Sequence, residues 1–120
     1  MPNPGSFIKS YRAEVAITGR TVVKFGSAGG IVPATAATDA AIGITDQLDA
    51  VVGDMVDVIM SGSAEVSLAG TVDAGDPVRG GAGGVVAAAA GAGNVAIGYA
   101  LADGVADDII DVAIARHSVT

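Results

Sequence analysis

Hydrophobic and polar residues alternate in short runs along most of the chain. In residues 54–60, Met55, Asp57 and Ile59 would face one side of an extended strand, and the residues between them would face the other. Comparable runs recur about every eight to twelve residues and are separated by turn-forming residues, a spacing typical of sandwiches and barrels. We therefore predict an all-β protein, folded as a compact sandwich or jelly-roll-like barrel of about ten short strands.

The beginning of the chain lacks this alternation. Residues 1–11 contain two Pro and one Gly and show no clear period, so we predict an extended N-terminal arm. The β-domain is then expected to cover residues 12–120 as a single unit. Its first two strands, residues 12–17 and 20–25, flank Thr18-Gly19, which predicts a tight hairpin.

The chain also repeats itself at an offset of 54 or 55 residues. The matched blocks, which follow one another in the same order, are 23–26 with 78–81, 28–32 with 82–86, 41–43 with 96–98 and 54–58 with 108–112. Two copies are fewer than the three or more that a solenoid needs. We therefore predict two copies of one unit, at about residues 19–60 and 74–115, within one compact domain.

The composition favours strands over helices. Ile and Val together number 27 against three Leu, and β-branched side chains fit a pleated sheet better than a helix. There is no Cys, which excludes disulfides and thiolate metal sites. The start of the sequence lacks the pattern of a secretion signal, and no apolar run is long enough to span a membrane. We expect a protein that is made and kept in the cytoplasm unless it leaves as part of a larger particle.

Charge is distributed unevenly along the chain, whose net charge is −7. Residues 1–24 carry four basic residues and one acidic residue, whereas residues 25–120 carry two basic and twelve acidic residues. An acidic body repels nucleic acid phosphates, so we expect no nucleic acid partner. A basic leading segment indicates contact with an acidic surface, although an acidic body can also serve solubility alone.

The repeated carboxylates are the first candidates for chemistry. Asp54 with Asp57, and Asp108 with Asp111, could bind Ca²⁺ or act as acid and base. Three residues apart on a strand, however, the two carboxylates of a pair face opposite sides. We predict instead that the first Asp of each pair accepts hydrogen bonds from turn amides.

The remaining candidate motifs also have structural explanations. The glycine-rich runs 26–30 and 80–84 lack the following helix and the Lys-Ser/Thr pair of a phosphate loop, which favours hairpin turns. His117 has no Cys or neighbouring acid as a partner. The segment 61–76 between the copies contains no Lys, which argues against a biotinyl or lipoyl carrier. We expect no catalytic, cofactor-binding or metal-binding residues and no membrane partner.

The N-terminal segment remains unexplained by folding alone, because it is rich in the aromatic and basic residues that dominate interface energetics. We predict that another subunit is contacted by five of its residues: Phe7, Ile8, Lys9, Tyr11 and Arg12. The alternative is that the arm folds back over its own sheet.

Several segments together resemble the small capsid cement, or decoration, proteins of tailed bacteriophages and prophages. The segments are Phe7-Ile8-Lys9-Ser10-Tyr11, Val22-Val23-Lys24-Phe25-Gly26, Ala41-Ile42-Gly43-Ile44, Gly62-Ser63-Ala64-Glu65-Val66, Ala74-Gly75-Asp76-Pro77-Val78 and Ala96-Ile97-Gly98-Tyr99-Ala100. The resemblance implies a β-sandwich or jelly-roll-like domain on the outside of an icosahedral virion shell. It also implies the major capsid protein as a partner, and self-association as a homotrimer or, alternatively, a homodimer.

Two other classes of function stay open. An acidic β-rich structural or adhesive module of a cell-surface or other assembly would have a similar composition, but the missing export signal argues against it. A small enzyme is disfavoured by the absence of Cys and the isolation of His117.

Overall fold

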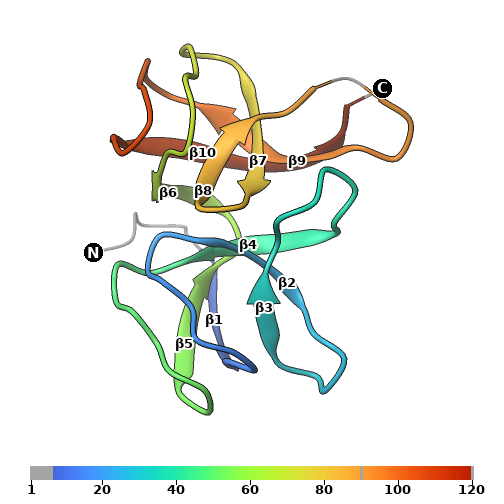
Figure 1. Ribbon diagram of the computed structural model, residues 1–120, viewed down its shortest axis with the longest axis vertical. Coiled ribbons are helices and arrows are strands. Elements are labelled where there is room, and N and C mark those ends of the chain that lie inside the picture. The colour runs from blue at the N-terminus through green and yellow to red at the C-terminus, as the bar shows by residue number, and fades with distance from the viewer. Residues whose placement is uncertain (1–6, 90, 120) are drawn as a thin grey trace.

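The computed structural model describes residues 7–89 and 91–119. In these residues, ten strands form two five-stranded antiparallel sheets that pack as a compact sandwich (Figure 1). The first sheet contains β1 (Ile8–Arg12), β2 (Val22–Phe25), β3 (Ile31–Pro33), β4 (Ala41–Thr45) and β5 (Met55–Ile59). The second contains β6 (Gly62–Ser67), β7 (Pro77–Gly81), β8 (Gly84–Ala87), β9 (Val95–Ala100) and β10 (Ile109–Ser118). The prediction of an all-β sandwich of short strands is confirmed.

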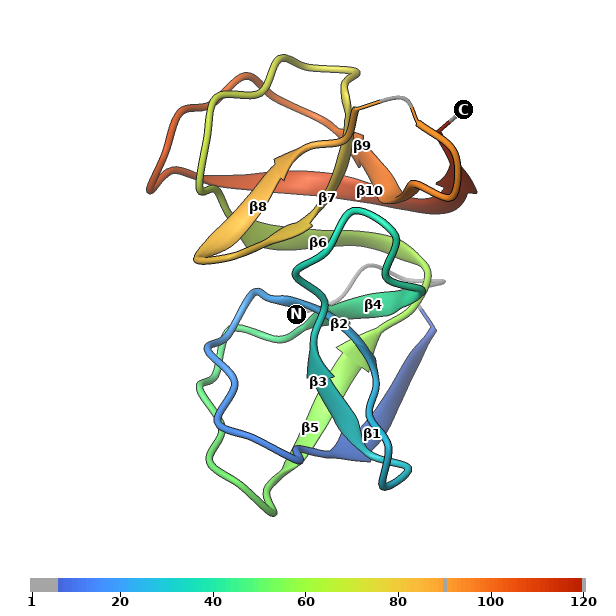
Figure 2. The same ribbon diagram turned by 45° about the vertical axis from the view of Figure 1, so that its right-hand side comes forward.

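The two sheets have the same topology. Their strand orders are β1-β5-β4-β2-β3 and β6-β10-β9-β7-β8, so each strand of the second sheet occupies the place of the strand five positions earlier. The parallel bridge between Ala13 and Ile31 recurs between Leu68 and Val85. Because these bridges join the end of the first strand to the third strand, each sheet curls around its own interior. Each half of the molecule, residues 7–60 and 61–119, is thus one copy of the same unit (Figure 2).

The prediction of an extended arm over residues 1–11 is wrong for the second part of that segment, which forms a strand of the sheet. Residues 1–6 lie outside the described residues. Ile8 to Arg12 form the edge strand β1 and pair with β5 over the whole strand, with Ile8 opposite Ile59 and Arg12 opposite Met55. The copies therefore also include β1 and β6, which have no recognisable sequence similarity and lie outside the predicted boundaries 19–60 and 74–115.

The predicted hairpin around Thr18-Gly19 is wrong, because β5 and β4 separate β1 from β2 in the sheet. The connecting segment instead crosses the sheet end, where Ile17 bridges to Ala50. A Cβ atom at Gly19 would lie 2.5 Å from the carbonyl carbon of Gln47. Glycine is therefore required here by the close approach of two loops and not by a hairpin turn.

Two buried clusters form the core. The first lies inside the first sheet and contains Ala13, Ile17, Val23, Ile31, Ile42, Ala50, Val56 and Val58. The second lies inside the second sheet and also recruits Val22, Ala34, Ala41 and Ile44 from the first half. The second cluster therefore continues across the junction and joins the halves.

The junction between the halves runs along β4, which packs against β6, β9 and β10. Arg116 Nη1 donates a hydrogen bond to the Ala41 carbonyl at 2.8 Å, and the Val95 N–H donates to the Ala37 carbonyl at 2.9 Å. A Cβ atom at Gly80 would overlap the Ala34 carbonyl oxygen, so glycine permits this close packing. The halves form one body held by apolar burial and by hydrogen bonds across the junction.

Candidate interaction surface

The five residues predicted to contact another subunit lie on β1 or directly before it. Phe7, Lys9 and Arg12 are exposed, whereas Ile8 and Tyr11 are half-buried. The Phe7 N–H donates to Ser61 Oγ at 2.9 Å, and the Phe7 carbonyl accepts the Met60 N–H at 2.7 Å. The segment is thus fixed to the first sheet. Its role as an interface stays a prediction, now for an ordered edge strand.

Tyr11 and Lys9 belong to a small aromatic group at the curled edge of the first sheet. The Tyr11 ring packs against the first core cluster and meets Phe25 edge to face, with ring centroids 5.3 Å apart. Lys9 Nζ lies 5.6 Å from the centre of the Tyr11 ring, within the range of a cation–π contact. Sequence reasoning placed Phe25 in a strand and did not associate it with β1. Only the curling of the sheet brings these residues together.

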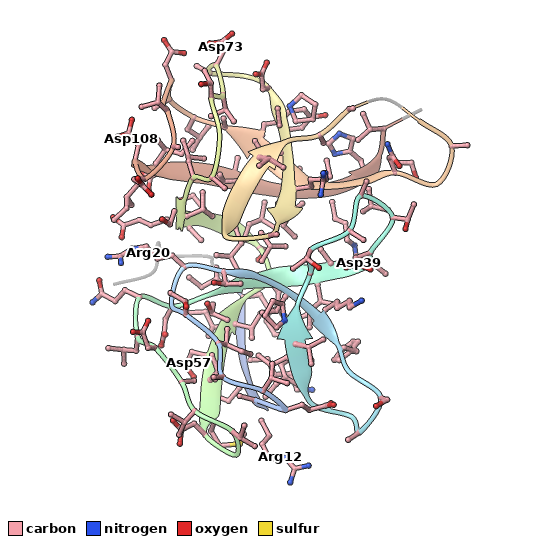
Figure 3. All side chains as sticks on the ribbon, viewed as in Figure 1. Arg12, Arg20, Asp39, Asp57, Asp73 and Asp108 are labelled. Atoms are coloured by element: carbon pink, nitrogen blue, oxygen red, sulfur yellow. The ribbon has the colours of Figure 1, made fainter. Side chains whose placement is uncertain are left out.

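A groove of about 470 Å³ lies between the halves, bordered by β1, β5, β6 and β10. Its carboxylates are Asp46, Asp57, Glu65 and Asp111. Arg20 crosses the junction, where Nε donates to Glu65 Oε1 at 3.2 Å (Figure 3 labels Arg20). The groove is therefore acidic with one bridging guanidinium.

The two copies contribute different chemistry to this groove. In the first copy, Ser10 Oγ donates to Asp57 Oδ1 at 2.6 Å. At the equivalent register position of the second copy, Glu65 stands opposite Asp111. Two carboxylates directly opposite on neighbouring strands repel each other, and Arg20 offsets part of this repulsion. The result is an acidic surface between the halves.

The four most exposed large apolar side chains in the described residues lie close together in the sequence and were not predicted as a site. The loop between β4 and β5 carries Leu48, Val51 and Val52, and β5 begins at Met55; these four side chains are each between 64% and 67% exposed. We call these four residues the apolar tip. Leu48 and Met55 line the same shallow pocket, and exposed apolar side chains that form one contiguous patch mark contact sites. The signal in the sequence was the presence of Leu and two Val in a segment whose Asp and Gly residues already predicted a loop.

The repeated carboxylates act in the turns, as predicted. Asp54 Oδ2 accepts the Val51 N–H at 3.0 Å, and Asp108 Oδ2 accepts the Val105 N–H at 3.0 Å. The glycine-rich runs form the β2–β3 and β7–β8 hairpin turns. His117 lies in β10 and stacks on Tyr99, with ring centroids 4.8 Å apart.

Across residues 7–89 and 91–119, no three His, Asp or Glu side chains gather as the ligands of a metal ion would. The same residues contain no helix that is long and apolar enough to cross a membrane. The surface features that remain for a function are therefore the aromatic group, the acidic groove and the apolar tip.

Comparisons with known proteins agree with this architecture. No protein-family model and no curated protein match the chain. Among solved structures, it is similar to the N base of the head fiber gp8.5 in bacteriophage phi29, with a TM-score of 0.70. The similarity covers 92% of this chain and 94% of that chain, at 18% sequence identity. At this level of identity the two chains share a fold, over nearly the whole length of both.

Proposed function

We propose that the protein is a structural component of a tailed-phage head, bound to the outside of the shell as a cement or decoration protein. The observation that carries the proposal is the structural similarity to the base of a phage head fibre, which extends over nearly all of both chains. The match covers 94% of that chain, so the two chains share the whole fold and not only a fragment of it.

The surface of the molecule supports a binding role. Its exposed large apolar side chains include three in the β4–β5 loop, Leu48, Val51 and Val52, and Phe7 directly before the edge strand β1. Its net charge of −7 keeps the free protein soluble and disfavours contact with packaged DNA. We propose the major capsid protein as its partner, with self-association as a homotrimer favoured over a homodimer. In this proposal it resides in the host cytoplasm before assembly, is not an enzyme and needs no cofactor.

The test is to locate the protein in virions. Mass spectrometry of purified particles is expected to identify the chain, and cryo-electron microscopy is expected to show the double sheet on the outer surface of the head. Particles assembled without the protein should lack that density and regain it when the purified protein is added. Absence from purified virions, or recovery in a host cell-surface fraction instead, would contradict the proposal.

Density that continues outward from the double sheet would give a finer result. It would identify the described residues as the base of a longer fibre. A compact density of one domain per copy would identify a cement protein.

A further inference from the structure

The apolar tip is larger than the fold requires. Val51 and Met55 have the apolar counterparts Val105 and Ile109 in the second copy. Leu48 and Val52 stand where the second copy has Ala102 and Ala106. The second loop forms the same turn with these alanines, so Leu48 and Val52 are not needed for folding.

The loop that carries the tip is held in place by its own carboxylates. Asp46 Oδ1 accepts the Leu48 N–H at 3.0 Å, and Asp54 Oδ2 accepts the Val51 N–H at 3.0 Å. Asp49 Oδ1 accepts the Gly19 N–H at 2.9 Å and ties the loop to the segment between β1 and β2. A preorganised loop loses little conformational freedom when a partner covers it, which favours binding.

The charges around the tip define the chemistry of its partner. Asp46, Asp49 and Asp54 line one shallow pocket together with Leu48 and Met55. Arg12 stands opposite Met55 in the β1–β5 register, at this end of the molecule (Figure 3). Two such tips would repel each other, because each carries an excess of carboxylates. The surface that fits the tip is apolar and bordered by Lys or Arg side chains.

We infer that the apolar tip is the surface by which this protein docks on an apolar, basic-bordered site of the shell protein. This inference rests on the proposed function and specifies which part of the molecule carries the contact. The corresponding loop of the second half, between β9 and β10, carries Leu101 and Val105, which are 54% and 56% exposed and so less exposed than the four residues of the apolar tip.

The experiment compares two matched double variants in binding to heads that lack the protein. The double variant Leu48→Ala with Val52→Ala gives the first loop the alanines that the second copy has at these two positions. This variant should therefore fold normally. Leu101→Ala with Val105→Ala removes comparable apolar side chains, 54% and 56% exposed, from the second half. The tip variant is expected to raise the Kd about tenfold or more, and the control to change it less than about twofold.

The border charge is tested separately with Asp46→Asn, which keeps an acceptor oxygen for the Leu48 N–H. This variant should weaken binding less than the tip variant and should reduce the dependence of Kd on salt. Circular dichroism and light scattering on every variant establish that fold and oligomeric state are retained.

Three results would overturn the inference. Equal effects of the two double variants would show that exposed apolar area counts regardless of its place. Unchanged head binding by the tip variant, with loss of self-association, would assign the tip to contacts between copies. Failure of the unmodified protein to bind heads would instead refute the proposed function, and with it the shell protein as the occupant of the tip.

Discussion

The two halves of the molecule share their backbone contacts and differ in their surfaces. In both, the residue after the first strand bridges to the third strand, and an Asp at the start of the last strand accepts a hydrogen bond from the amide three residues before it. Asp49 and Asp103 also have the same role, since they accept the N–H groups of Gly19 and Ala74. Because both copies keep these contacts, we expect them to stabilise the fold of the unit.

The two copies differ at positions that are exposed on the surface or that face the other half. Phe25 is exposed in the first half, whereas its counterpart Gly80 packs on the Ala34 carbonyl at the junction. Ser10 and Asp57 form a hydrogen bond, whereas their counterparts Glu65 and Asp111 are two carboxylates facing the groove. The two copies thus keep the same turn hydrogen bonds, whereas their surfaces differ in contact chemistry.

At one place in the core, the two copies fill the same space with a different pair of residues. Substitutions there are expected to have the largest effect on the free energy of unfolding. The first half has Ala13 and Ala50, and the second has Leu68 and Gly104 at the equivalent places. A Cβ atom at Gly104 would lie 2.6 Å from Leu68 Cδ1, so the larger residue fills space that the smaller one leaves. We expect Leu68→Ala to lower the free energy of unfolding by about 3 kcal/mol, measured by urea denaturation.

A double variant sharpens this comparison. Adding Gly104→Ala to Leu68→Ala should restore about 1 kcal/mol, because the new methyl group occupies part of the vacated space, as Ala50 does in the first half. Gly104→Ala alone should be destabilising, since it meets the intact Leu68. Strictly additive effects of the two substitutions would show that these positions do not share one packing volume.

The shared turn carboxylates should respond alike in the two halves. Asp54→Ala and Asp108→Ala each remove the acceptor of one turn amide and should each cost about 1 kcal/mol in unfolding free energy. The matched Asn variants keep an acceptor oxygen and should recover most of this loss. A cost confined to one half would contradict the equivalence of the two turns.

Much of the fold could be predicted because the strands and turns use local signals. The alternation in residues 54–60 predicts the strand β5, and the glycine-rich runs predict the β2–β3 and β7–β8 turns. The edge strand β1 was missed because Lys9 faces the same side as Tyr11, which removes the alternation of polar and apolar residues. Its counterpart β6 differs in sequence, so the repeat gave no signal there either.

The candidate surfaces were less predictable for a physical reason. The groove joins Arg20 to Glu65, which are distant in the chain, and the aromatic group joins Tyr11 to Phe25 through the curl of a sheet. Strand spacing predicts neither the order of strands nor the curl. The apolar residues of the tip can be read from the sequence. Only the fold, however, shows that their side chains are exposed and can therefore contact a partner.

The smallest expected effect concerns a charge that one copy has and the other lacks. Asp39 in the first half corresponds to Asn94 in the second, and Asp39 Oδ1 accepts a hydrogen bond from Lys24 Nζ at 2.9 Å. Partial burial alone would raise the pKa of Asp39. The N–H of Ala36, the Lys24 ammonium and the N–H of Thr35 outweigh burial and hold this pKa below its ordinary value of 3.8.

A lowered pKa in the folded state means that the ionised carboxylate stabilises the protein above the pKa of the unfolded chain, and that this stabilisation is lost as the pH falls through the folded-state pKa. Asp39→Asn should therefore cost about 0.5 kcal/mol at neutral pH, since exposed and partly exposed ion pairs contribute little, and nothing well below pH 3.8. Lys24→Gln, which leaves the two amide hydrogen bonds in place, should reduce the pH dependence without abolishing it. The measurement is urea denaturation of the three proteins between neutral and acidic pH. A difference between the unmodified protein and Asp39→Asn that stays constant with pH would show that the carboxylate acts only as a hydrogen-bond acceptor, as Asn94 could in the other half.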